Sequence, residues 1–227
     1  MKLVLFDVDG TLVDSQNIIV AAQRQAFASV GLPAPSRAQS LSIVGLSLHE
    51  AFKTLTGPEA PIEALAEAYK DAFHTLRADP ANHEPFFPGA LETIAALAAR
   101  DDVLLGVATG KSRRGVAYLV ERAGWSGIFS TIQTADDNPS KPAPDMVLNA
   151  LAETGVAPQD AVLVGDTTFD MIMARDAGIA RIGVAWGYHP AAALRGAGAQ
   201  TIAADFRDVL SWIDRITALR GKEPAYG

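Results

Sequence analysis

Short apolar runs recur along the chain, and each ends in a cluster of small or polar residues. The clearest runs cover residues 3–6, 103–108, 161–165 and 181–186. Stretches with apolar residues at helical spacing lie near them, at residues 89–100, 112–124, 144–155 and 167–178. Nearly continuous apolar strands that alternate with helices are typical of a parallel sheet covered on both faces. The pattern therefore predicts an α/β fold with an open, doubly wound parallel sheet.

Residues 15–83 have a different pattern, with helical periodicity and no strand-like run. They predict an all-helical insert placed directly after the first strand. A segment rich in proline and polar residues, 79–89, ends this insert as a hinge would. We therefore expect an α/β core made of residues 1–14 and 84–227, and a smaller helical cap domain made of residues 15–83. Residues 221–227 are predicted to form a loose tail.

Composition narrows the class of protein. The 227 residues include no cysteine, which excludes disulfides, thiolate metal sites and cysteine nucleophiles and fits a reducing compartment. A net charge of −7 disfavours non-specific binding to nucleic acid. No apolar run approaches the roughly 20 residues of a membrane span, and Asp7 interrupts the only run that might resemble a signal peptide. We expect a soluble cytoplasmic protein whose partners include neither nucleic acid nor membrane.

Carboxylates follow two of the predicted strands. Asp7 and Asp9 come directly after the run at 3–6, and Asp166 and Asp170 follow the run at 161–165. Taken alone, the first pair fits an Asx turn and Asp166 fits a helix cap. Because ligands of such sheets sit at the carboxyl ends of the strands, we expect the four side chains to converge. Each close pair of like charges would then cost on the order of 4 kcal/mol at ~4 Å and an effective dielectric near ~20. A divalent cation offsets that cost, and a set of carboxylates without histidine or cysteine favours Mg²⁺ over Zn²⁺.

Two further segments contribute a hydroxyl group and cations. Thr109 and Gly110 follow the run at 103–108 and precede a helix, so the hydroxyl and the backbone amides form a candidate anion site. The spacing from Gly106 to Gly110 is one residue too short for the phosphate loop of nucleoside triphosphatases, which excludes that class. Lys141, in a proline-rich loop, is predicted to supply the cation that the carboxylates require. Lys111 is expected only to face solvent.

The segments DVDGT, VATG, SKPAPD and GDTTFD, in this order, resemble the four motifs of the haloacid dehalogenase superfamily. The helical insert resembles the first type of cap found in that superfamily, and the motifs are most similar to those of phosphoglycolate-phosphatase-like members. The resemblance implies a Mg²⁺-dependent phosphatase. Such an enzyme would hydrolyse the phosphomonoester of a small metabolite, phosphoglycolate or a similar compound, through an aspartyl-phosphate intermediate.

The resemblance also implies a role for each motif residue. Asp7 would be the nucleophile, and Asp9 would protonate the leaving alcohol and then activate water. Asp166 would bind Mg²⁺ beside Asp7 and the carbonyl oxygen of Asp9, and Asp170 would support the metal site. Lys141 would neutralise the charge of the nucleophile and the phosphoryl group. The predicted phosphate- and substrate-binding residues are Gly10, Thr11, Thr109, Gly110 and Lys141 in the core and Gly45, Leu46 and Ser47 in the cap.

Several alternatives stay open. Dehalogenases of the superfamily lack the second aspartate, so Asp9 favours phosphoryl chemistry. A phosphonate-cleaving enzyme would need a lysine in the cap, but Leu48 stands at the expected place and Lys53 lies five positions on. A sugar-phosphate mutase shares all four motifs, and a regulatory protein that binds a phosphate ligand could use the same fold.

The expected partner is a small-molecule phosphate ester, and we expect a monomer or a homodimer. Three arginines are candidates for pairing a carboxylate of the substrate: Arg77, Arg113 and Arg114.

Overall fold

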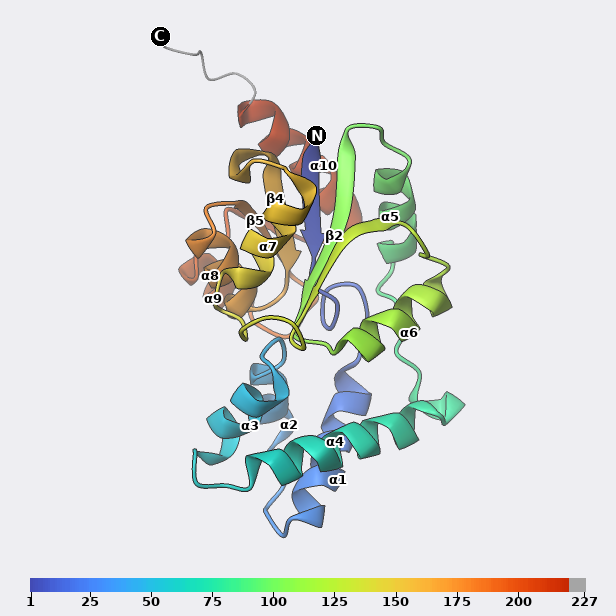
Figure 1. Cartoon of the computed structure of the whole chain (residues 1–227), viewed down its shortest axis with the longest axis vertical. Coiled ribbons are helices and arrows are strands. Elements are labelled where there is room, and N and C mark those ends of the chain that lie inside the picture. The colour runs from blue at the N-terminus through green and yellow to red at the C-terminus, as the bar shows by residue number, and fades with distance from the viewer. Residues whose placement is uncertain (221–227) are drawn as a thin grey trace.

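The computed structural model describes residues 1–220, and the predicted tail at 221–227 lies outside that range. Within it, six parallel strands form one sheet in the order β3-β2-β1-β4-β5-β6 (Figure 1). The strands are β1 (Lys2–Phe6), β2 (Val103–Thr109), β3 (Phe129–Thr134), β4 (Ala161–Gly165), β5 (Ala180–Val184) and β6 (Thr201–Ala203). This strand order is that of a doubly wound sheet, so the predicted fold class is confirmed.

Helices cover both faces of the sheet. One face packs against α5 (Ala90–Ala98), α6 (Arg113–Ala123) and α10 (Phe206–Arg220), through side chains such as Ile94, Leu119 and Val209. The other face packs against α7 (Asp145–Thr154) and α8 (Thr168–Asp176), through Met146 and Met173. A short helix, α9 (Ala191–Gly196), contacts β5 and β6. Strands β1 and β4 are therefore buried on both sides, which explains their continuous apolar sequence.

The predicted helices of the core end close to the expected residues. The hydroxyl of Ser112 accepts a hydrogen bond from the backbone amide of Gly115 and caps α6 at its N-terminus. Gly124 and Gly155 follow α6 and α7 in the left-handed conformation, with φ of 68° at both positions. Ser112, Gly124 and Gly155 are the residues that the sequence predicts at these helix ends, and the structure confirms them as caps.

Strands β3 and β6 and helix α10 were not predicted from the apolar pattern. β3 has the sequence FSTIQT, in which buried Thr131 and Gln133 replace the expected apolar residues. The amide of Gln133 donates a hydrogen bond to the hydroxyl of Thr131 over 3.0 Å, so their polar atoms are satisfied inside the protein. β6 is three residues long, too short to stand out as an apolar run.

Only helices lie between residues 15 and 83. They are α1 (Gln16–Ser29), α2 (Arg37–Ser42), α3 (Leu48–Thr56), α4 (Ile62–Arg77) and the 3-10 helix η1 (Pro80–Asn82); a second 3-10 helix, η2 (Pro158–Asp160), precedes β4. The insert has a core of its own that includes Phe27, Phe52 and Leu65. In Figure 1 these helices lie beyond the end of the sheet toward which the arrow of β1 points.

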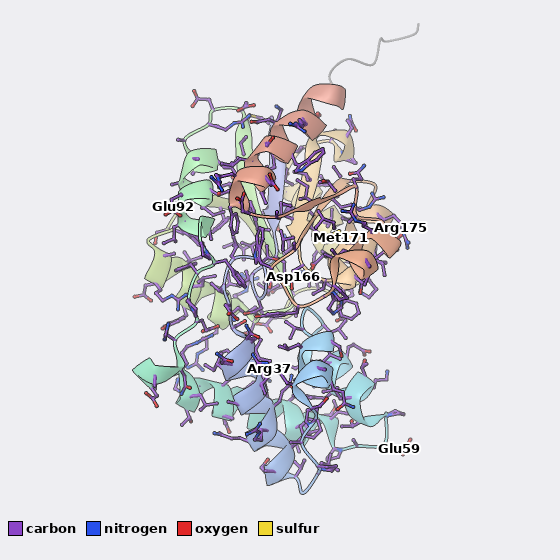
Figure 2. All side chains as sticks on the ribbon, turned by 180° about the vertical axis from the view of Figure 1, so that it is seen from behind. Arg37, Glu59, Glu92, Asp166, Met171 and Arg175 are labelled. Atoms are coloured by element: carbon purple, nitrogen blue, oxygen red, sulfur yellow. The ribbon has the colours of Figure 1, made fainter. Side chains whose placement is uncertain are left out.

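Two adjacent segments join the helical insert to the core. Val13 and Phe86 form an antiparallel bridge, and the amide of Asp14 donates a hydrogen bond to the carbonyl of Pro85 over 2.8 Å. Figure 2 shows Asp166 close to the junction between the two parts. The domain limits at residues 14 and 84 stay a prediction, and these crossing segments are where they would fall. In residues 1–220 no helix combines the length and the hydrophobicity that a membrane span requires.

Candidate active site

The loop after β1 delivers the first carboxylate. The amide of Asp7 donates a hydrogen bond to the carbonyl of Val164 in β4 over 3.0 Å, which holds the end of β1 against its neighbour. The chain then turns at Gly10, where φ is 86°. A side chain at Gly10 would overlap the carboxylate of Asp166, so this turn needs glycine both for its backbone conformation and for space.

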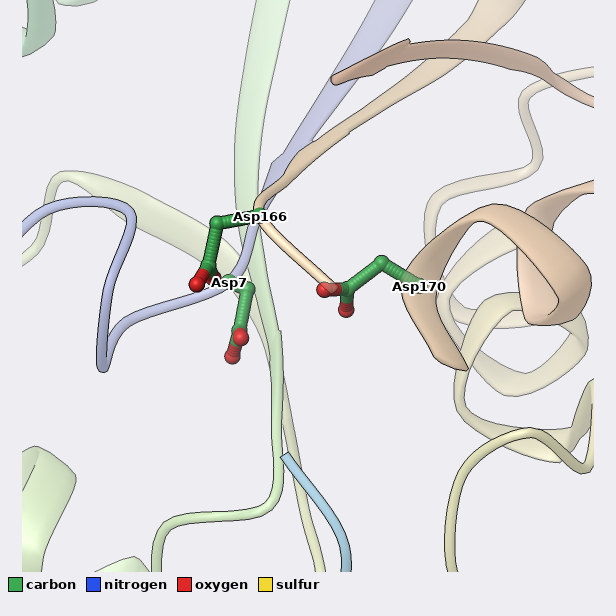
Figure 3. Close-up of side chains that lie close together, drawn as sticks. All are labelled: Asp7, Asp166 and Asp170. Carbon is green, nitrogen blue, oxygen red and sulfur yellow. The ribbon is translucent and has the colours of Figure 1, made fainter. Parts of the chain in front are cut away.

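Three carboxylates meet at the carboxyl ends of β1 and β4. The three residues are buried, and they are Asp7, Asp166 and Asp170 (Figure 3). One carboxylate oxygen from each lies within 4.8 Å of one oxygen of each of the other two. Two neighbours fix Asp166: the hydroxyl of Thr11 donates to Oδ1 over 3.0 Å, and the amide of Tyr188 donates to Oδ2 over 2.8 Å. Three of the four carboxylates predicted to converge therefore do so, and the side chain of Asp9 is the exception. Thr11, predicted as a phosphate ligand, has its hydroxyl turned to Asp166.

Lys141 lies inside the same cluster. Its side chain is fully buried, and its Nζ is 2.6 Å from Oδ1 of Asp170 and 3.0 Å from Oδ1 of Asp7. Burial alone would lower the pKa of Lys141, but the carboxylates of Asp170 and Asp7 outweigh that effect and raise it. Asp170 is fixed in turn by Thr167, the N-cap of α8, whose hydroxyl donates to Oδ2 over 2.6 Å. Lys141 is therefore held as a cation between two carboxylates.

The cluster carries more negative charge than Lys141 balances. Burial raises the pKa of Asp7 to about 6, against the opposing effect of Lys141 and with a further rise from Asp170. Burial also raises the pKa of Asp166 well above its usual value, and the carboxylates of Asp7 and Asp170 add to the rise. Within the described residues, neither side-chain oxygen of Asp7 accepts a well-aligned hydrogen bond. Buried oxygen donors with uncompensated charge fit a hard divalent cation such as Mg²⁺.

The carboxylate of Asp9 points away from the cluster. Its Oδ1 accepts hydrogen bonds from the hydroxyl of Ser15 over 2.6 Å and from Nζ of Lys111 over 2.7 Å. This leaves only the backbone of Asp9 as a possible metal ligand, which is the part that the family resemblance implies. The side chain of Asp9 is 12% exposed, so it is not sealed from the space beside the cluster.

The expectation that Lys111 faces solvent is wrong. Its side chain is only 8% exposed, and besides Asp9 it pairs with Glu84, whose Oε1 is 3.1 Å away. Glu84 also pairs with Arg77, with 2.9 Å between Oε2 and Nε. These ion pairs connect Lys111 of the core, Glu84 of the segment that joins the insert to the core, and Arg77 of α4. The sequence did not predict them because nothing in the local pattern around Lys111 or Glu84 indicates their contact.

Loop residues of the cap lie against the predicted phosphate site. Thr109 is buried at the end of β2, and a Cβ on Gly110 would overlap the carbonyl oxygen of Gly45 in the cap. The amide of Ser47 donates a hydrogen bond to the hydroxyl of Ser140 over 2.8 Å. The cap therefore approaches the core through its backbone, and glycine at position 110 permits this close contact.

A cavity of about 520 Å³ lies between the cap and the core. The predicted cap residues Gly45, Leu46 and Ser47 line it, and so do Arg77 and Arg114. Arg113 is different: its side chain is 62% exposed and pairs with Asp137. Lys53 is 54% exposed and pairs with Glu50, so it lies on the outer surface of the cap, where it cannot serve as the lysine of a phosphonate-cleaving site.

Comparison with known proteins agrees with this geometry. A family model described as haloacid dehalogenase-like hydrolase matches residues 4–184. The chain is 33% identical over 228 residues to a Dickeya dadantii protein named "Probable phosphatase IndB", with 99% of this chain and 98% of that protein covered. It is 33% identical over 199 residues to the phosphoglycolate phosphatase of Chromobacterium violaceum, with 86% and 89% covered. The crystal structure of a hydrolase from Pseudomonas syringae matches with a TM-score of 0.82 and 27% identity over 95% of this chain and 99% of that one.

These matches cover the motifs and the helical insert together. The family model begins within β1 and ends with β5, so it includes every carboxylate of the cluster. The relatives match along most of the chain, and the solved structure has the same fold with its cap. The chain therefore belongs to the haloacid dehalogenase-like hydrolase superfamily, in the phosphoglycolate-phosphatase-like group that carries a helical cap.

Proposed function

We propose that this protein is a Mg²⁺-dependent phosphatase that hydrolyses the phosphomonoester of a small molecule through an aspartyl-phosphate intermediate. The observation that carries the proposal is the buried group of Asp7, Asp166 and Asp170 with Lys141 inside it. Names of relatives support phosphatase chemistry, since two of them are named as phosphatases. Glycolate phosphate is the first ester to test, because it is the substrate in the name of one relative.

Asp7 is the proposed nucleophile. One of its carboxylate oxygens attacks phosphorus, the bond between phosphorus and the ester oxygen breaks, and an aspartyl-phosphate forms. Within the described residues no well-aligned hydrogen bond or ion pair engages Oδ2 of Asp7, which leaves this oxygen for the attack. Lys141 keeps the carboxylate and the incoming phosphoryl group from repelling each other, because its ammonium group lies 3.0 Å from Oδ1 of Asp7. The hydroxyl of Thr109 and the amide of Gly110 would hold phosphoryl oxygens.

Asp9 is the proposed general acid and base. It gives a proton to the ester oxygen as the alcohol leaves, and later takes a proton from the water that attacks the aspartyl-phosphate. Ser15 and Lys111 fix the position of its carboxylate for both steps. The second step releases inorganic phosphate and restores Asp7.

Asp7, Asp166 and the carbonyl of Asp9 would hold the metal ion, with Asp170 supporting the site. When bound, Mg²⁺ supplies positive charge that stabilises the phosphoryl oxygens in the transition state. Without it, burial raises the pKa values of Asp7 and Asp166, and repulsion from the neighbouring carboxylates adds to the rise. Cap residues close the site from the other side and exclude water that is not needed for the reaction.

The test is phosphate release from a generic aryl phosphate by the purified protein. Activity should disappear when divalent cations are chelated and return with Mg²⁺. Asp7→Asn should lower kcat by at least about a thousandfold, since it removes the nucleophile but keeps the size of the side chain. Asp14→Asn, which changes a carboxylate outside the buried cluster, is the matched control and should keep most of the activity. Full activity of Asp7→Asn would refute the nucleophile, and no turnover with any ester would favour a phosphate-binding regulator.

A further inference from the structure

The cavity between cap and core lies on the side of the site where the leaving group would be. It reaches the catalytic loops through Asp9, Gly110 and Lys111. Asp9 is the residue proposed to protonate the ester oxygen, so the atoms bonded to that oxygen must extend from Asp9 into this space. The properties of the cavity therefore describe the alcohol that the enzyme releases.

The cavity is much larger than a two-carbon alcohol needs. Its volume of about 520 Å³ falls in the range of roughly 300–1,000 Å³ that holds a drug-sized ligand. Since one water occupies about 30 Å³ of liquid, a small ester would leave most of the space to solvent. Solvent next to the reacting bond weakens the electrostatic stabilisation on which the proposed chemistry depends.

Aromatic rings form one wall of this space. Phe52, Tyr69 and Phe73 all line the cavity, and the rings contact one another in series: the centroids of Phe52 and Tyr69 are 5.8 Å apart, and those of Tyr69 and Phe73 are 5.6 Å apart. Aliphatic residues such as Ile19 and Val44 add to the apolar lining. A wall of this kind stabilises a ligand in proportion to the apolar surface that the ligand buries, and a ring meets it better than a short polar chain does.

Two polar atoms in the lining residues lack partners within the described residues. Oε1 of Gln23 is buried without a hydrogen bond, and the residue as a whole is 2% exposed. Nη2 of Arg77 is also buried without a hydrogen bond, although Nε of the same side chain pairs with Glu84. Buried polar atoms without partners are costly, so each indicates a group that a ligand would satisfy. Gln23 would accept a hydrogen bond from the ligand, and Arg77 would donate one.

We infer that the substrate is a phosphomonoester of a bulky alcohol that carries an aromatic or other apolar ring, together with a polar substituent for Gln23 or Arg77. The inference rests on the proposed phosphatase activity and specifies its substrate class. The rings of Tyr69 and Phe73, packed on the fully buried Phe52, contact the apolar part of the alcohol, and Tyr69 and Phe73 determine specificity without taking part in the chemistry.

Alkyl phosphates with matched leaving groups test this inference. Ethyl phosphate and 2-phenylethyl phosphate both release a primary alcohol, so a difference in kcat/KM reports the added ring and not an easier bond to break. At about 25 cal/mol per Å² of apolar surface, burying a phenyl ring should raise kcat/KM by about tenfold to a hundredfold. The kcat/KM for glycolate phosphate should be close to that for ethyl phosphate. The measurement uses the full chain with saturating Mg²⁺.

Two variants place the effect in this cavity. Phe73→Ala removes one ring of the wall, and Ala51→Phe fills part of the cavity from α3, since Ala51 also lines it. Each should lower the ratio of kcat/KM for 2-phenylethyl phosphate to that for ethyl phosphate by at least about fivefold. Leu91→Ala is the control, because Leu91 is 41% exposed on α5 and does not line the cavity. Its ratio should match that of the wild type.

The outcomes separate the two proposals. Hydrolysis that requires Asp7 but proceeds equally well with ethyl and 2-phenylethyl phosphate would overturn the inference about the substrate and leave the phosphatase proposal intact. A preference for the larger ester that both cavity variants leave unchanged would also overturn it. If no ester is hydrolysed in a reaction that depends on Asp7, both proposals are overturned.

Discussion

Replacing Asp7 with asparagine should stabilise the metal-free protein at neutral pH. The pKa of Asp7 is raised from 3.8 to about 6, chiefly because the carboxylate is buried. At about 1.36 kcal/mol per pKa unit, ionising this group costs the folded state about 3 kcal/mol relative to the unfolded chain. Asparagine has nearly the same shape and no charge, and Lys141 keeps its pair with Asp170 in the variant. The gain in the free energy of unfolding should therefore approach about 3 kcal/mol.

The sign of the effect depends on pH. Because the pKa of Asp7 is higher in the folded state, its contribution to stability is fully present below about pH 4 and is lost as the pH rises through about 6. The variant carries no such group at position 7. The free energies of unfolding of the two proteins should thus differ little near pH 4. Their difference should grow with pH and become constant above about pH 7.

Urea unfolding in the presence of a chelator measures this difference. Urea denaturation curves followed by circular dichroism should give different free energies of unfolding for the two proteins at pH 8 and nearly equal ones at pH 4. In a thermal scan at pH 8, a gain of about 3 kcal/mol corresponds to about 6–12 °C in Tm for a chain of this size. Asp101→Asn is the control, since it changes an exposed carboxylate, and should alter stability by less than about 0.5 kcal/mol. Saturating Mg²⁺ should narrow the gap by stabilising the wild type. A variant that is less stable at pH 8, or a gap equal at both pH values, would refute the reasoning.

Two further substitutions test contacts of the cap and the linker. Gly110→Ala should lower kcat/KM at least about tenfold, because its Cβ would overlap the carbonyl of Gly45 and push the cap away. The control is Gly196→Ala, which should change kcat/KM little because a Cβ there meets open space. A Gly110→Ala variant as active as the wild type would contradict the close contact. Lys111→Met should destabilise the fold by about 3 kcal/mol, since the carboxylates of Asp9 and Glu84 lose a buried cation. An unchanged midpoint of urea unfolding would contradict this.

Much of the core could be predicted from the sequence because two independent signals coincide there. Strands buried on both faces have continuous apolar sequences, and their ends carry the polar residues of the site. This is why Asp7, Asp166 and Lys141 could be expected to meet, and the structure brings them together. β3 escaped prediction because buried Thr131 and Gln133 satisfy each other with a hydrogen bond, so the strand has no apolar run.

The surroundings of Asp9 could not be predicted for a different reason. Whether Lys111 is buried depends on Glu84, a residue of the linker that only the folded chain brings close. A lysine after a strand looks the same in a sequence whether solvent or two carboxylates surround it. The shape of the cavity is likewise a property of the cap and the core together, so the rings of Tyr69 and Phe73 carried no signal of their function until their positions were known.

The position of β1 in the sheet has a consequence for synthesis of the chain on the ribosome. Of the six strands of this sheet β1 is made first, yet it pairs with β2, which begins at residue 103, and with β4, which begins at residue 161. The helical insert emerges long before either partner and can collapse around its own core. Both edges of β1 stay open until β2 is made, and the edge that pairs with β4 stays open until residue 161 and beyond; an open apolar edge is a template for aggregation. Synthesis that stops before residue 161 would therefore leave a chain in which β1 lacks one of its two neighbours.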